Sequence, residues 1–146
     1  MERRKFIKSC VIGCSSMATI ALTLESCGTS AYYAKTTLAG SSYTIAKSEF
    51  VVVNKNKTID RKYVLIRPAT LGYPICIYKI GPESYSALLM ECTHKSCELQ
   101  PQSTFLVCPC HGSEFTSKGE VQNPPAERNL KTFPITTDSE NIYLQL

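Results

Sequence analysis

Residues 92–97 read Cys-Thr-His-Lys-Ser-Cys, and residues 108–113 read Cys-Pro-Cys-His-Gly-Ser. These two segments contain both histidines of the 146-residue chain and four of its eight cysteines. Thiolate and imidazole groups together bind iron–sulfur clusters or zinc, and either site takes four protein ligands. Two ligands from each segment would complete such a set. The two segments therefore predict a metal centre, and the ligand types alone leave iron–sulfur and zinc both open.

Short β-rich runs surround the two Cys-His segments. They occur at residues 49–53, 62–66, 75–80, 85–90, 104–107, 132–136 and 142–146, with Gly, Pro and Asn between them. Strands of this length at roughly ten-residue spacing predict an all-β sandwich or a small barrel. Each Cys-His segment follows a predicted strand, so we expect both segments to form loops at one end of a sheet.

The two motifs, Cys-x-His-x-x-Cys and Cys-x-Cys-His-Gly-Ser, resemble the Rieske iron–sulfur signature. The resemblance implies a small antiparallel Rieske-type sandwich over residues 43–146, with two cluster-binding loops at one end. It also implies one [2Fe-2S] cluster per chain. Cys92 and Cys108 would then bind one iron, and His94 and His111 would bind the other.

The resemblance implies roles for three further residues of the motifs. Cys97 and Cys110 match the disulfide that ties the two loops together in one class of the family. Ser113 matches a serine whose hydroxyl donates a hydrogen bond to a bridging sulfide. Such a bond stabilises the added negative charge of the reduced state and raises the reduction potential.

Two residues depart from the family pattern, and one segment matches it. Phe115 stands where high-potential members have a tyrosine that donates to a ligand sulfur, so we expect a lower potential than theirs. Lys95 stands at the cluster tip, where respiratory members carry an apolar residue, and its charge argues against the same cytochrome b partner. Residues 123–126, Asn-Pro-Pro-Ala, resemble the proline loop that covers the cluster from a third side.

An exported zinc-binding structural domain without a redox role is the alternative function. Two Cys and two His from the loops could close a zinc tetrahedron. That site would leave two cysteines of the motifs without a role, and a site of four cysteines would leave both histidines unexplained.

The N-terminus resembles a bacterial export signal. Residues 2–5 read Glu-Arg-Arg-Lys, a twin-arginine run, and residues 9–24 are uncharged and mostly apolar or small. This stretch is shorter than the roughly 20 residues that a membrane-spanning helix needs, which favours a signal segment. Residues 24–27 resemble a lipobox that would make Cys27 the lipidated residue.

The N-terminal pattern predicts three parts of the chain and a location. We expect a twin-arginine, lipoprotein-like signal over residues 1–26, a flexible tether over 27–42 and the Rieske-type domain over 43–146. The protein would be lipid-anchored on the exported, periplasmic or cell-surface face of a bacterial membrane. A disulfide also requires an oxidising compartment.

Composition limits the possible activities. A net charge of +4 is too weak to indicate nucleic-acid binding. The two histidines are both in the cluster motifs, so the chain has none for the mononuclear iron of a Rieske oxygenase or for a Ser-His-Asp triad. No independent catalytic site is visible. We therefore expect one-electron transfer to redox protein partners, as a carrier or a small subunit of an oxidoreductase or quinol-oxidising complex.

Overall fold

The computed structural model describes residues 31–54 and 57–146. The predicted signal over residues 1–26 and the predicted lipidation residue Cys27 lie outside these ranges. Among the described residues, no helix has the length and apolar character needed to cross a membrane.

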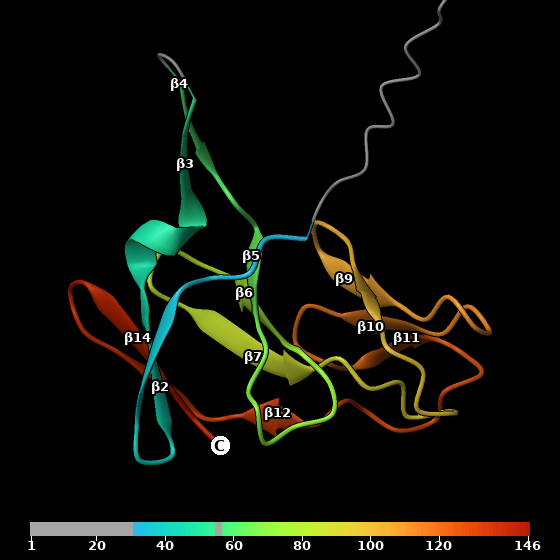
Figure 1. Ribbon diagram of the computed structural model, residues 1–146. Helices are drawn as coiled ribbons and strands as arrows, with labels where there is room; N and C mark the ends of the chain where they lie inside the picture. The colour runs from blue at the N-terminus through green and yellow to red at the C-terminus, as the bar shows by residue number, and fades with distance from the viewer. Residues whose placement is uncertain (1–30, 55–56) are drawn as a thin grey trace, which may run out of the picture.

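The described residues form three four-stranded sheets and one hairpin, all antiparallel (Figure 1). The first sheet has the order β1 (Thr36–Ala39), β2 (Ser42–Ala46), β14 (Asn141–Gln145), β13 (Ile135–Thr137). The second has the order β12 (Thr132–Phe133), β7 (Tyr85–Leu89), β6 (Ile75–Lys79), β5 (Tyr63–Ile66). The third has the order β11 (Val121–Asn123), β10 (Glu114–Thr116), β9 (Phe105–Val107), β8 (Gln100–Pro101). The hairpin consists of β3 (Val51–Asn54) and β4 (Lys57–Asp60), and a short 3-10 helix, η1 (Lys47–Phe50), precedes it.

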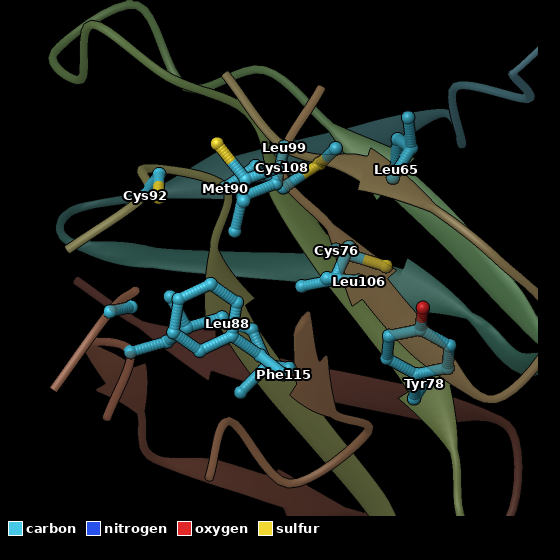
Figure 2. Packing of buried hydrophobic residues seen from close by; sticks show 12 residues of the cluster. Leu65, Cys76, Tyr78, Leu88, Met90, Cys92, Leu99, Leu106, Cys108 and Phe115 are labelled. Atoms are coloured by element: carbon cyan, nitrogen blue, oxygen red, sulfur yellow. The ribbon is translucent and has the colours of Figure 1, made fainter. Parts of the chain in front are cut away.

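The second sheet is the central layer, and its two faces contribute to different cores. Side chains alternate between the faces of a strand, so neighbours in β5 and β6 separate into two buried clusters. Leu65 and Cys76 pack toward the third sheet with Leu106 and Phe115, as Figure 2 shows. The opposite face packs toward the first sheet through a second set: Val64, Ile66, Ile75, Ile77, Ala87, Tyr43, Ile45, Ile142 and Leu144.

This architecture confirms the predicted all-β, antiparallel fold. The apolar runs at β5, β6 and β14 form strands because the cores bury most side chains of β5 and β6 and alternate side chains of β14. Cys76 is fully buried in β6, as expected for a small apolar side chain in a core.

The predicted tether is wrong for residues 36–42. Those residues form β1 and the start of β2, and Tyr33 forms a parallel bridge to Leu65 of β5. Every residue of β1 is exposed, so this edge strand lacks the apolar alternation that predicts strands. The predicted strand at 49–53 also begins late, because residues 47–50 form η1 instead.

Candidate metal centre

The first Cys-His segment forms a tight loop after β7. The Cys92 N–H donates to the Cys97 carbonyl at 2.9 Å, and the Ser96 N–H donates to the Cys92 carbonyl at 2.8 Å. Ser96 closes the turn with φ +54°, a left-handed conformation that is unusual for a residue other than glycine.

The second segment repeats this geometry between β9 and β10. The Cys108 N–H donates to the Ser113 carbonyl at 2.8 Å, and the Gly112 N–H donates to the Cys108 carbonyl at 2.9 Å. Gly112 has φ +77° at the position equivalent to Ser96. In both loops, therefore, the first cysteine begins a turn of the same geometry.

A disulfide between Cys97 and Cys110 joins the two loops, with an S–S distance of 2.04 Å. This confirms the pairing that the family resemblance implied. The sulfur atoms of both residues and of Cys108 all lie within 4.8 Å of one another. The cross-link therefore fixes the two loops directly beside one of the predicted ligands.

Two free thiols lie between the loops. Cys92 and Cys108 are each 1% exposed and belong to the same buried cluster. Burial raises the pKa of the Cys92 thiol, and the nearby Cys108 thiol contributes to this increase, while backbone N–H groups of His94 and Lys95 that donate to the Cys92 sulfur lower it. These two thiols are thus placed as two neighbouring ligands of one metal would be.

The two imidazoles lie next to each other across the loops. The ring centroids of His94 and His111 are 4.9 Å apart, with an interplanar angle of 84°. Nδ1 of His94 is buried and has no hydrogen-bond partner. An unpartnered buried nitrogen is costly, and coordination to a metal would remove that cost. Two buried thiols and two facing imidazoles therefore fit a [2Fe-2S] cluster.

Two further segments support the loops. Ser113 is fully buried, and its Oγ accepts the Ala126 N–H at 3.0 Å. The Asn123 amide donates to the Gly112 carbonyl at 3.3 Å. Residues 123–126, the predicted proline loop, are thus bonded to the second loop.

The first loop is held by a contact that sequence reasoning missed. The Thr93 hydroxyl donates to the Arg128 carbonyl at 2.6 Å, and the Arg128 guanidinium donates back to the Thr93 carbonyl at 3.4 Å. Neither residue carries a pattern that marks it, because both bonds use backbone carbonyls. Lys95 is exposed beside half-buried His94, and Phe115 is fully buried in the core that includes Cys108.

A family model described as Rieske [2Fe-2S] domain matches residues 42–134 of the chain. The cytochrome b6-f complex iron-sulfur subunit of Synechococcus sp. (strain JA-3-3Ab) is 36% identical over 53 residues, which are 35% of this chain and 31% of that protein. The ubiquinol-cytochrome c reductase iron-sulfur subunit of Rickettsia felis is 37% identical over 65 residues, 42% of this chain and 37% of that protein. The matches thus span about a third of these relatives.

The structure also resembles a solved protein. The crystal structure of the cyanobacterial plasma membrane Rieske protein PetC3 from Synechocystis PCC 6803 matches with a TM-score of 0.52 and 27% identity. The match covers 58% of this chain and 87% of that one.

Proposed function

The chain belongs to the Rieske [2Fe-2S] domain family, and on that basis we propose that it carries single electrons as part of a redox chain at a membrane. A domain of this family binds a [2Fe-2S] cluster, which supplies one-electron redox chemistry. The observation that carries the proposal is the placement of two buried thiols and two facing imidazoles between the two cross-linked loops.

Four residues would hold the cluster, two from each loop. Cys92 and Cys108 would bind one iron, because both thiols are free and buried in the same cluster. His94 and His111 would bind the other, and the unpartnered Nδ1 of His94 is the nitrogen suited to do so. Neutral imidazole in place of two thiolates favours the reduced state and supports a potential between about −150 and +300 mV.

Three neighbouring residues would set the potential within that range. Ser113 is buried and accepts a hydrogen bond from Ala126, so its own proton remains available to donate toward the cluster. Phe115 offers no hydroxyl in the adjacent core, which favours a potential below that of members with tyrosine there. The exposed Lys95 places a positive charge beside His94, where a partner would dock.

The protein partners are proposed from the relatives. Those relatives are iron-sulfur subunits of the cytochrome b6-f complex and of ubiquinol-cytochrome c reductase. We propose that this chain serves as a carrier or small subunit of a quinol-oxidising or related oxidoreductase complex. The disulfide supports an oxidising location. The N-terminal sequence pattern supports the exported face of a bacterial membrane and Cys27 as the lipid attachment residue. Loss of lipid labelling in Cys27→Ser would test that attachment.

An EPR-monitored redox titration with metal analysis tests the cluster assignment. We expect two irons per chain and an EPR signal that appears on reduction, lost in Cys92→Ser and Cys108→Ser. Cys76→Ala is the matched control, because Cys76 is equally buried and free but belongs to β6 and not to either loop. Bound zinc without an EPR signal at any potential would instead establish the structural zinc domain.

A further inference from the structure

The β3–β4 hairpin stands apart from the three sheets. In Figure 1 it projects from the upper side of the molecule, and it pairs with no other strand of the described residues. All of β4 and most of β3 are exposed. A two-stranded hairpin alone is only marginally stable in water, so this element gains from a second surface.

Apolar side chains are exposed on both faces of the hairpin. Val53 is 76% exposed and Ile59 is 54% exposed. Val53 lies opposite Thr58, whereas Ile59 lies opposite Val52, so Val53 and Ile59 occupy opposite faces. A flat protein surface would cover only one face. A lipid layer into which the hairpin is inserted would cover the apolar side chains on both faces.

The described residues of the two strands carry one cation, Lys57, and one anion, Asp60, and the excess of positive charge lies at the base of the hairpin. Lys57 is exposed in β4, and Arg61, Lys62 and Lys79 line a shallow pocket of about 260 Å³ directly after it. Asp60 in the same pocket pairs with Lys79 at 3.5 Å. Even with Glu49 of η1 counted, these four cations and two carboxylates leave a net charge of +2. An anionic surface would therefore be favoured over a neutral one.

The N-terminal end of the described chain is fixed to the base of this hairpin. The Arg61 guanidinium lies 3.6 Å from the centroid of the Tyr32 ring, and the Tyr32 hydroxyl donates to the Glu49 carboxylate at 2.7 Å. Arg61 also donates to the Glu49 carbonyl at 2.9 Å. Glu49 precedes the hairpin and Arg61 follows it, so any membrane attachment through the preceding residues brings the hairpin to the same membrane.

We propose that the β3–β4 hairpin lies in the headgroup layer of a bilayer that contains anionic lipids. Val53 and Ile59 reach toward the boundary with the acyl chains, and the cations at the base contact lipid phosphates. Lys57 pairs with Asn54 and so lies farther from the base than Val53 and Ile59, and its long side chain extends back to the phosphates. The proposal rests on the proposed membrane location but not on the cluster ligands. It assigns the hairpin a second role, which is to orient the domain relative to the membrane next to its point of attachment.

Vesicle sedimentation of residues 31–146 tests the proposal. Both buried cores are built from residues of this range, so the domain folds without the first 30 residues and their predicted lipid. We expect the cluster-loaded domain to sediment with vesicles of phosphatidylglycerol and phosphatidylcholine, and far less with phosphatidylcholine alone. The Val53→Ser/Ile59→Ser variant should lower the partition coefficient roughly tenfold or more, because both apolar side chains are lost.

Matched control variants distinguish lipid binding by the hairpin from non-specific binding by other exposed apolar side chains. Leu38→Ser removes an apolar side chain of β1 that is 55% exposed, nearly the fraction of Ile59, and should leave binding unchanged. Lys57→Glu should weaken binding only to the anionic vesicles. We expect each variant to keep the EPR signal of the parent, so failure of lipid binding is distinguishable from failure of the cluster assignment.

Three outcomes would overturn the lipid proposal. They are no binding to either vesicle, equal binding of the hairpin variants and the parent, and equal losses in Leu38→Ser and Val53→Ser/Ile59→Ser. A dimer in sedimentation velocity that Val53→Ser/Ile59→Ser dissociates, without any vesicle binding, would replace the lipid with a second copy of the chain.

Discussion

At the scale of single residues, the two cluster loops contain turns of the same geometry, but a different amino acid takes the left-handed position in each. Gly112 takes φ +77° without cost, whereas Ser96 takes φ +54° with a Cβ that disfavours it. We expect Ser96→Gly to raise the free energy of unfolding by about 0.5–1 kcal/mol, the relief of strain being partly offset by a more flexible unfolded chain. Urea denaturation measures this. Ser103→Gly, at an exposed serine without positive φ, should show no such gain.

Ser113 links the second loop to the proline loop through a single oxygen. Because its Oγ accepts the Ala126 N–H, the hydroxyl proton is free to point elsewhere. We expect Ser113→Ala to lower the reduction potential while both irons are retained. Ser86→Ala, which removes a hydroxyl that donates to the Ser117 carbonyl, is the control and should leave the potential unchanged. An unchanged potential in Ser113→Ala would contradict its assigned role.

The sequence predicted a set of ligand residues for the proposed centre, but it did not predict the contacts that hold the two loops in place. The Cys-His spacing indicated the ligand set and the Cys97–Cys110 pair through a family resemblance. The structure confirms that pair. The Thr93–Arg128 bonds were not predictable, because they join residues 35 positions apart through backbone carbonyls. The left-handed conformation of Ser96 was not predictable either, because no glycine stands at that position to indicate it.

At the scale of elements, the disulfide makes one unit of the two loops. It closes a loop of 13 residues, and a cross-link of this kind stabilises by about 3 kcal/mol, mainly by constraining the unfolded chain. We expect Cys97→Ser/Cys110→Ser to lose roughly that stability and to release iron faster. Thermal unfolding and the rate of iron capture by a chelator measure the two effects. Cys76→Ala is again the control, because it changes a cysteine that closes no loop.

The turn between β13 and β14 predicts a dependence on pH. Hydrogen bonds from Tyr143 and from the backbone N–H groups of Glu140 and Asn141 lower the pKa of Asp138 to about 2. The ionised carboxylate therefore stabilises the turn fully above its ordinary value of 3.8, and this contribution is lost as pH falls through about 2. Asp138→Asn should be less stable than the parent at pH 5, and the difference should vanish near pH 2. Urea titrations at each pH, followed by circular dichroism, test this, and Tyr143→Phe should show part of the effect.

The strands that bury the most apolar side chains are the ones that the sequence predicts. β5, β6 and β7 contribute to both cores and carry clear apolar runs. β1 is wholly exposed, and β10 and β11 are three residues each, so neither pattern nor length marked them. Strand pairing of this kind comes from tertiary contacts that local propensity does not contain.

At the scale of the whole molecule, the central sheet couples the cluster loops to the most distant layer. Its alternate side chains belong to two different cores, so neither outer sheet can lose its packing alone. We expect Leu144→Ala in β14 to cost about 2–5 kcal/mol and to lower the midpoint of cluster loss as much as that of backbone unfolding. Cluster absorbance and circular dichroism during one thermal ramp test this. Cluster loss at the parent's midpoint would show that the layers unfold independently.

The bridge between Tyr33 and Leu65 makes Tyr33 part of the folded domain, so the segment that links Cys27 to the domain is shorter than the predicted tether of residues 27–42. With Cys27 as the lipid-bearing residue, only four residues lie between it and Tyr32, which contacts Arg61 at the base of the hairpin, so the two are five residue steps apart. Fully extended, these steps reach at most about 17 Å, whereas a tether running to residue 42 would reach roughly 50 Å. The domain would therefore stay close to the membrane surface. A donor or acceptor whose redox centre lies farther from that surface would have to move toward the membrane to exchange electrons with it.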